Sequence, residues 1–381
     1  MEFRDLKKQY QVLKADIDDA MQKVAASGNY IMGGPVIELE EQLADYVGVK
    51  HCITCANGTD ALTLALKSLG IGKGDAVFVP DFTFFASAEV VALEGATPVF
   101  VDVNPRTFNI DVVSLKEAID AVENEGILKM KAIIAVDLFG LPADFIAVRK
   151  IAKQHGLYVI EDGAQGFGGR MAEGIACSLG DISTTSFFPA KPLGCYGDGG
   201  AVFTNNDKWA DIIRSLRIHG KGRNKYDNVR IGMNSRIDTL QAAILQVKLN
   251  AFKEHELEAV NHVAAQYTRL INQALGNAIT TPYISEGYMS SWAQYTLQLT
   301  DASQRMGIQT HMKETGIPTM IYYPTPMSMQ TVFSSVHSYV DTPNAQKLSQ
   351  CVLSLPMHPY LTDEDIQMIV DALVANIKTG K

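Results

Sequence analysis

Short apolar, β-branched runs alternate with helical patterns between about residue 50 and residue 205. Apolar residues recur at helical spacing between most of these runs, as in 59–70 and 144–156. The runs that predict strands are 52–56, 76–80, 97–103, 131–140, 157–162, 183–188 and 199–205. Continuous apolar strands joined by helices are typical of a largely parallel sheet covered on both faces. Ligands of such sheets bind beyond the carboxyl ends of the strands, so the residues that follow each strand are the functional candidates.

The pattern changes in the last third of the chain. Residues 235–275 have helical spacing over roughly eleven turns, at 3.6 residues per turn. Residues 290–300 alternate as a half-buried strand, and 319–324 predict another strand. Residues 301–318 predict a helix, and a capped terminal helix begins at Thr362. A long helix therefore leads into a second, smaller unit.

These patterns predict two domains. The large one covers residues 1–249, and its first 25 residues form a helix that can pack on the small domain. The small α+β domain covers residues 250–381. A chain of 381 residues suits this division.

Composition narrows the function. Hydrophobic residues make up 47% and charged residues 20%, as in ordinary soluble proteins. The net charge of −9 disfavours binding to nucleic acid or to an anionic membrane. The first ten residues are charged and lack the apolar core of a signal peptide, and no run reaches the roughly 18 apolar residues of a membrane span. We expect a cytoplasmic protein.

The chain has five cysteines, an odd number that is widely scattered. Cys52 and Cys55 form a C-x-x-C, but no second pair or histidine cluster follows. Buried free thiols in a reducing compartment are therefore favoured over a metal or redox site.

Three strand ends carry polar groups. Asn57, Gly58 and Thr59 open a helix whose free N–H groups can cradle a phosphate, although the same residues also suit a plain helix cap. Asp162 ends an apolar strand, where an unpaired carboxylate is costly. Lys191 follows another strand, between Pro189 and Pro192.

An amine, a carboxylate, a phosphate cradle and an aromatic side chain thus project to one edge of one sheet. Pyridoxal phosphate needs these four groups, because its aldehyde bonds an amine and its ring nitrogen pairs with a carboxylate. The rigid setting of Lys191 suits an amine that must meet an aldehyde with little freedom to lose.

The chain also resembles the DegT/DnrJ/EryC family of sugar-nucleotide aminotransferases. Seven segments spread in order over nearly the whole chain carry the resemblance: SGNYIMGGP, CANGTDAL, PDFTFFASAE, IEDGAQ, TTSFFPAKPLGCYGDGGA, RIGMNSRIDTLQAAIL and VLSLPMHPYL. It implies fold type I of the pyridoxal phosphate enzymes (aspartate aminotransferase-like), with a mostly parallel seven-stranded sheet. Within the family the chain is similar to members that act on UDP-2-acetamido-2-deoxy-3-oxo-glucuronate, on the route to the sugars of surface polysaccharides such as O-antigen and lipopolysaccharide.

The resemblance implies roles for residues around the cofactor ring. Lys191 resembles the Schiff-base lysine, and Asp162 would pair with the pyridinium nitrogen. Gln165 would lie beside the phenolic oxygen, and Phe84 would stack on the ring. Taken alone, Phe84 suits ordinary core packing equally well.

Further roles concern the phosphate and the sugar. Gly58, Thr59 and Ser186 would bind the phosphate, although Ser186 also suits a strand cap. Asn234 would reach the phosphate from the neighbouring subunit, which implies a homodimer with shared active sites. Arg236 would face a uronate carboxylate with its guanidinium fork, unless it pairs with a local acid such as Asp238.

Two further features, one residue and one loop, concern the substrate. Tyr322 stands where several relatives have a histidine before Tyr-Pro, so the sugar substituent recognised there can differ. His219 and Lys221 lie in a polar loop that is either a lid over the active site or a solvated loop.

The implied reaction is a ping-pong transamination of a keto-sugar nucleotide, with L-glutamate as the amino donor. Three alternatives stay open. The first is a dehydratase, although the related dehydratases have lost the Schiff-base lysine that this chain keeps as Lys191. The others are a non-catalytic regulator that binds the cofactor, and an aminotransferase for a UDP- or dTDP-linked 3- or 4-keto-6-deoxy sugar. A regulator would usually carry a DNA-binding module, which neither the charge nor the layout supplies.

Overall fold

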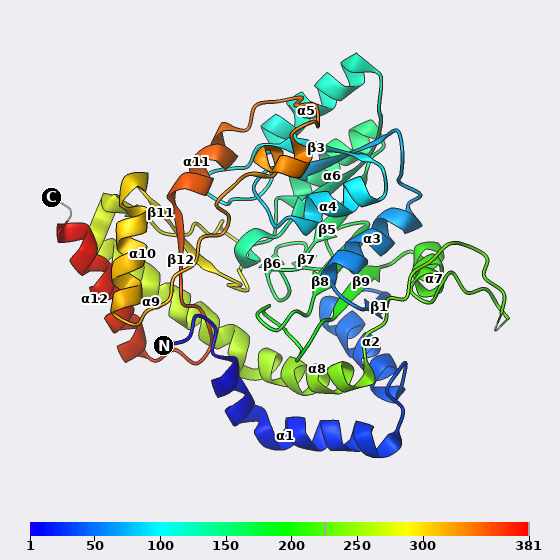
Figure 1. Ribbon diagram of the computed structural model, residues 1–381, viewed down its shortest axis with the longest axis horizontal. Helices are drawn as coiled ribbons and strands as arrows, with labels where there is room; N and C mark the ends of the chain where they lie inside the picture. The colour runs from blue at the N-terminus through cyan, green and yellow to red at the C-terminus, as the bar shows by residue number, and fades with distance from the viewer. Residues whose placement is uncertain (225, 380–381) are drawn as a thin grey trace.

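A seven-stranded sheet forms the centre of the molecule (Figure 1). The computed structural model describes residues 1–224 and 226–379. The strand order is β1-β9-β8-β5-β4-β2-β3, and all neighbours run parallel except β9, which is antiparallel to both β1 and β8. The strands are β1 His51–Cys55, β2 Asp75–Pro80, β3 Thr97–Val101, β4 Lys129–Val136, β5 Tyr158–Asp162, β8 Ile182–Ser186 and β9 Gly200–Thr204. The expected mostly parallel, seven-stranded sheet is confirmed.

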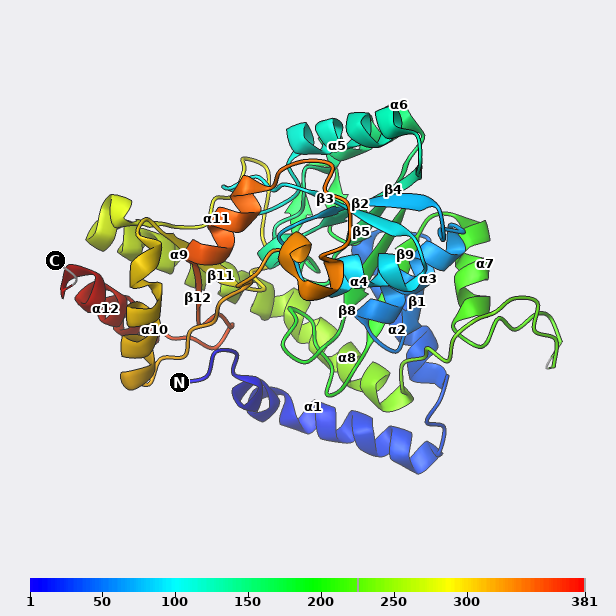
Figure 2. The same ribbon diagram turned by 45° about the horizontal axis from the view of Figure 1, so that its top comes forward.

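Helices cover both faces of this sheet, as its doubly apolar strands require (Figure 2). One face packs on α3 Gly58–Ser68, α4 Ala86–Leu93 and α7 Asp207–Leu216. The other face packs on α2 Gly34–Val47, α5 Val112–Glu125 and α6 Phe145–His155. A small hairpin, β6 Arg170–Met171 and β7 Gly174–Ile175, follows β5.

The register places the functional strand ends side by side. Asp162 at the end of β5 lies opposite Thr184 of β8 and Val136 of β4. Ser186 ends β8 opposite Gly200, which in turn lies opposite the last residue of β1. The carboxyl ends of β1, β5 and β8 therefore share one edge.

The expected long helix is present but interrupted. It consists of α8 Thr239–Ala251, a π-helical turn at Phe252–Glu256 and α9 Leu257–Leu275. The amino-terminal helix α1 Leu6–Ser27 packs along α8 through a separate apolar cluster that includes Leu13, Ile17, Ile244 and Ala251.

The carboxyl-terminal part contains a three-stranded antiparallel sheet of β10 Ile279–Thr280, β11 Tyr295–Leu299 and β12 Val352–Leu355. Its helices are α10 Arg305–Glu314, α11 Pro343–Cys351 and α12 Asp363–Thr379. Thr362 caps α12, because its hydroxyl accepts the N–H of Asp365 at 3.2 Å. Short 3₁₀ turns lie at Leu138–Gly140, Gly276–Ala278, Ala302–Gln304, Met327–Met329 and Thr331–Phe333.

The predicted strand at 319–324 is wrong. Only Met320 pairs with the sheet, exchanging backbone hydrogen bonds of 3.1 and 2.8 Å with Ser354. The chain then leaves the sheet edge, so that Tyr322 and Tyr323 line a cavity instead of a strand. Pro324, which has no N–H to donate, follows directly.

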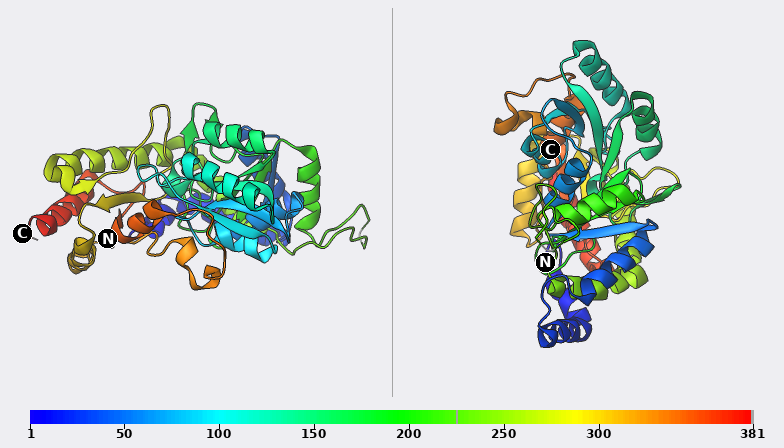
Figure 3. Two further views of the ribbon diagram at one scale, coloured as in Figure 1. Left: turned by 90° about the horizontal axis from the view of Figure 1, so that it is seen from above. Right: turned by 90° about the vertical axis from the view of Figure 1, so that its right-hand side faces the viewer.

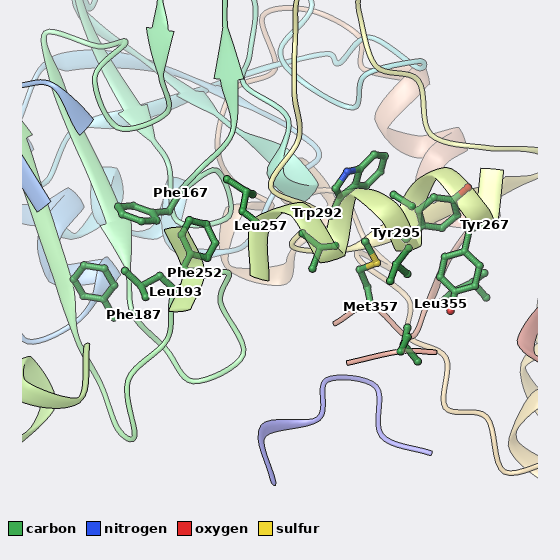
Figure 4. Packing of buried hydrophobic residues seen from close by; sticks show 14 of the residues in the cluster. Phe167, Phe187, Leu193, Phe252, Leu257, Tyr267, Trp292, Tyr295, Leu355 and Met357 are labelled. Carbon is green, nitrogen blue, oxygen red and sulfur yellow. The ribbon is translucent and has the colours of Figure 1, made fainter. Parts of the chain in front are cut away.

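A continuous apolar core joins the two sheets (Figure 4). Phe167 and Phe252 lie at the large-sheet end, with ring centroids 5.8 Å apart, and Trp292 and Tyr295 lie at the other end, 5.6 Å apart. The domain division at residues 249 and 250 stays a prediction. The five cysteines are buried free thiols, as expected. Within residues 1–224 and 226–379, no helix has the length and apolar character of a membrane span.

Candidate functional site

A cavity of about 640 Å³ lies beyond the carboxyl ends of β1, β5 and β8. Eight of the residues expected at the site line it: Gly58, Thr59, Phe84, Asp162, Gln165, Ser186, Lys191 and Tyr322. A second hollow of similar volume, between α1, α2 and α8, contains none of them. The chemistry therefore belongs to the first cavity.

The carboxylate of Asp162 is held in place at the floor of this cavity. Its side chain is buried, and its Oδ2 accepts the Ser87 hydroxyl at 2.7 Å while Oδ1 accepts the N–H of Ala164 at 3.2 Å. Ser87 is in turn 3.1 Å from the hydroxyl of Thr83. These donors fix the buried carboxylate so that it can face a cationic partner in the cavity.

Lys191 lies in a tight loop after β8. Its N–H donates to the carbonyl of Phe188 at 2.9 Å, and the N–H of Cys195 donates to Phe187 at 2.8 Å. Burial lowers the pKa of the Lys191 amine, and the charge of Asp162 partly opposes this shift. The site thus favours a neutral, nucleophilic amine near a fixed carboxylate.

The amino terminus of α3 forms one wall. Asn57 caps the helix by accepting the N–H of Asp60 at 2.8 Å, while the N–H groups of Gly58 and Thr59 make no hydrogen bond within the described chain. A Cβ on Gly58 would lie 2.7 Å from the Cβ of Ser186. The glycine keeps open a cradle in which free N–H groups and a hydroxyl can hold a phosphate.

The neighbouring strand requires a glycine for a related reason. A Cβ on Gly200 of β9 would lie 2.5 Å from the carbonyl carbon and oxygen of Asn57. The backbone of β9 therefore passes directly against the turn that opens α3.

Aromatic and amide groups form the opposite wall. The Oε1 of Gln165 accepts the N–H of Phe139 at 2.7 Å, and its Nε2 donates to the Tyr323 hydroxyl at 3.0 Å. Phe84 is 52% exposed and lies 6.1 Å from the Tyr323 ring, between centroids. An aromatic so exposed inside a cavity is available to stack on a flat ligand, which ordinary core packing would not leave free.

Sequence reasoning missed several lining residues. Phe188 and Asp198 lie in the Lys191 loop, so their proximity to the lysine could have indicated them. Tyr323 and Gln294 come from the carboxyl-terminal part and have no local signal. The Oε1 of Gln294 is buried without a hydrogen-bond partner among the described residues.

Two expected residues do not line this cavity. Asn234 is exposed and Arg236 is half-buried, while Ser235 between them accepts the N–H of Ala56 at 3.1 Å. Arg236 makes no ion pair with Asp238 in the part of the chain that the structure describes.

The suggested lid is not closed over this chain's own cavity. His219 and Lys221 are exposed and lie outside the residues that line it. They belong to the segment between α7 and α8, which projects from the body of the molecule in two views (Figures 1 and 3).

Comparison with known proteins identifies the family. The model of the DegT/DnrJ/EryC1/StrS aminotransferase family matches residues 11–374. The chain belongs to this family. It is 46% identical to the UDP-2-acetamido-2-deoxy-3-oxo-D-glucuronate aminotransferase of Pseudomonas aeruginosa, over 98% of this chain and 99% of that protein. It is also 43% identical to a pleiotropic regulatory protein of Geobacillus stearothermophilus, over 97% and 96% of the two chains.

Solved structures agree with this assignment. A DegT DnrJ EryC1 StrS aminotransferase from Brucella abortus has a TM-score of 0.95 and 46% identity, and the match covers all of both chains. A Bacillus subtilis relative with bound cofactor PMP has a TM-score of 0.82 and 30% identity, over 96% of this chain and 82% of that chain. The expected fold type I is confirmed, and the protein is a pyridoxal phosphate-dependent aminotransferase. The amine, carboxylate, cradle and exposed aromatic of the cavity fit this cofactor.

Gly58→Ala tests the cradle. Because the added Cβ must displace the β8 end at Ser186, we expect cofactor affinity to fall by at least about tenfold, or about 1.4 kcal/mol. Absorbance titration of the apoprotein with pyridoxal phosphate measures this affinity. Gly307→Ala is the matched control, since a Cβ there meets open space; equal losses in both variants would contradict the assignment.

The lowered pKa of Lys191 predicts the pH dependence of cofactor incorporation. Only the neutral amine bonds an aldehyde, so the rate should rise about tenfold per pH unit below the pKa. Since burial lowers that pKa, the rate should level off below pH 10.5, the ordinary value for lysine. Stopped-flow absorbance of apoprotein mixed with cofactor gives the profile. A rate still rising above pH 10.5 would show an ordinary, solvated amine.

Proposed function

We propose that this enzyme acts in the cytoplasm and aminates UDP-2-acetamido-2-deoxy-3-oxo-glucuronate at carbon 3, with L-glutamate as the amino donor. In this proposal the amino sugar serves the synthesis of surface polysaccharides. The relative from P. aeruginosa, matched over nearly the full length of both chains, is the observation that carries the substrate. The cavity chemistry described above supports the reaction type.

The residues around the reacting centre have distinct tasks in this proposal. When bound, pyridoxal phosphate supplies an aldehyde and an electron-accepting ring. Asp162 would pair with the ring nitrogen, because its carboxylate is fixed and desolvated. Lys191 would supply the amine that holds the aldehyde, and its Nζ would hold and move the proton in the exchange of the amino group. Phe84 would offer its exposed ring for stacking, and Gln165 has one N–H left for the phenolic oxygen.

In this proposal the cradle at the start of α3 holds the phosphate without a basic side chain. The N–H groups of Gly58 and Thr59 and the hydroxyl of Ser186 supply the donors, at the positive end of an 11-residue helix.

In this proposal the sugar pocket combines Tyr322 of one subunit with Arg236 of the neighbouring subunit, from the same segment as Asn234. Tyr322 lines the cavity and packs edge-on against Tyr323, with centroids 5.6 Å apart. The guanidinium of Arg236 has no acidic partner in the described chain, which leaves its fork for a uronate carboxylate. A 6-deoxy sugar lacks that carboxylate, and it is the alternative substrate that this pocket would disfavour.

We further propose a homodimer in which Asn234 completes the partner's phosphate site. Asn234 is exposed and lies outside its own chain's cavity. Exposed apolar side chains lie on the neighbouring segments, with Tyr30 49%, Ile31 43% and Ile231 90% accessible. Residues 30 and 31 are bonded to this region through the Ile31–Asp238 bridge. Such an apolar face is typical of a subunit interface.

Turnover of purified protein with glutamate tests the substrate. We expect the UDP-3-keto-uronate to give an amino sugar and 2-oxoglutarate, detected by mass spectrometry, while a dTDP-4-keto-6-deoxy sugar reacts far more slowly. Arg236→Gln should raise KM for the uronate by roughly 10- to 100-fold, the worth of a charged hydrogen bond.

Two controls separate the outcomes. Lys191→Ala should abolish both the visible absorbance of the bound cofactor and turnover. Absence of product from every keto-sugar nucleotide, with the cofactor bound normally, would favour the regulator and end the aminotransferase proposal.

Mixed dimers test the shared site. Lys191→Ala and Asn234→Ala subunits are each inactive as homodimers in this proposal. A mixed dimer keeps one intact site, formed by Lys191 of one subunit and Asn234 of the other. Random assortment of equal amounts of the two variants makes about half of the dimers mixed. Because each mixed dimer has one intact site of two, roughly a quarter of the wild-type activity should return. If Asn234 served its own chain, both sites of the mixed dimer would be defective and no activity would return.

A further inference from the structure

The first five residues contact both the carboxyl-terminal part and the loop after β8 before α1 begins. The terminal ammonium donates to the carbonyl of Gly316 at 3.4 Å, and the carbonyl of Phe3 accepts the N–H of Met357 at 3.0 Å. Figures 1 and 2 both show the amino terminus beside α10. We call residues 1–5 the amino-terminal strap.

The strap also touches both sides of the cofactor cavity. The Phe3 ring lies edge-on to Tyr322, which lines the cavity, with centroids 6.2 Å apart. The Nη2 of Arg4 donates to the carbonyl of Pro192 at 3.2 Å, in the residue that follows Lys191. Pro192 has no N–H of its own to donate.

The strap is fixed at its far end as well. Asp5 caps α1 by accepting the N–H of Lys8 at 2.8 Å. One turn later, Gln9 donates to the buried carboxylate of Glu256 at 2.9 Å, and the hydroxyl of Tyr360 donates to the same carboxylate at 2.5 Å. Arg4 therefore has limited freedom to leave the carbonyl that it binds.

We propose that the amino-terminal strap positions the loop that carries Lys191, with Arg4 as its anchor, and that it braces the cavity wall through Phe3. Arg4 is a positioning residue, because its guanidinium contacts the carbonyl of Pro192 and not the reacting atoms. This inference rests on the proposed role of Lys191 in bonding the cofactor.

The charge of Arg4 adds a second effect on the amine. The charge of Asp162 raises the pKa of the Lys191 amine, and the charge of Arg4 lowers it. Arg4 is half-buried, and its desolvation lowers the pKa of the guanidinium to about 10. The guanidinium still carries its charge at neutral pH.

The surroundings of Arg4 contain further titratable groups. Glu256 and Tyr360 raise the pKa of Arg4 by their charge. Burial lowers the pKa of Lys248 on α8 to about 8 and that of His358 after β12 to about 4, and the charge of Arg4 lowers both further. His358 is therefore neutral between pH 6 and 9, whereas Lys248 titrates within that range.

Arg4→Gln tests the proposal in the full-length holoenzyme. Loss of the positive charge favours protonation at Lys191, so the pH midpoint of the cofactor's visible absorbance should rise by roughly 0.5–1 unit. Loss of the bond to Pro192 should speed hydrogen exchange in residues 188–195. Arg4→Lys keeps the charge but not the fork, so its midpoint should stay near wild type while exchange increases.

Lys7→Gln is the matched control, because the Lys7 side chain is 83% exposed and, among the described residues, bonds only Glu2. It should leave both readings unchanged. An Arg4→Gln protein with the wild-type midpoint and wild-type exchange would overturn the proposal. If Arg4→Gln fails to fold, Arg4→Lys decides alone, and wild-type exchange in residues 188–195 would reject the anchor.

Comparison of Lys191→Ala with the Arg4 variants distinguishes a failure of the strap proposal from a failure of the proposed function. Should Lys191→Ala keep the visible absorbance, the role of Lys191 is wrong and the strap has no catalytic amine to position. Should Lys191→Ala lose it while both Arg4 variants behave as wild type, only the strap proposal fails.

Discussion

The register between β5 and β8 is the constraint on which the site depends. Asp162 pairs with Thr184, and Ile160 pairs with Ile182, both isoleucines being fully buried. Because side chains alternate between the two faces of a strand, a slip of one residue would turn Asp162 away from the cavity and a core isoleucine out of its cluster. The placement of a carboxylate is thus secured by the packing of apolar residues in the same strand.

Much of the fold could be predicted because buried parallel strands have a strong local signal. All seven predicted strands of the large sheet exist, with ends that differ by a few residues. The order of the strands could not be predicted, since the insertion of β9 between β1 and β8 depends on pairing across distant segments. The π-turn at Phe252–Glu256 was also hidden, because a helical apolar pattern continues through it.

The residues of the candidate site were likewise predictable from the sequence only in part. Residues that follow strands of the large sheet, such as Asp162 and Lys191, could be found because strand ends meet at a common edge. Tyr323 and Gln294 reach the cavity only because the core around Trp292 fixes the small sheet against the large one. No local pattern encodes that approach. Asn234, which was expected to reach a neighbouring subunit, and Arg236 both lie outside the cavity of their own chain.

The crowding around Gly58 and Gly200 has an evolutionary consequence. Neither position has room for a side chain, since each would collide with the strand end or the turn beside it. The cofactor half of the cavity is therefore closed to gradual change, whereas the wall that contains Tyr322 and Gln294 comes from irregular backbone and the small sheet. New sugar specificities can arise by drift in that wall alone, with the inherited amine chemistry left intact.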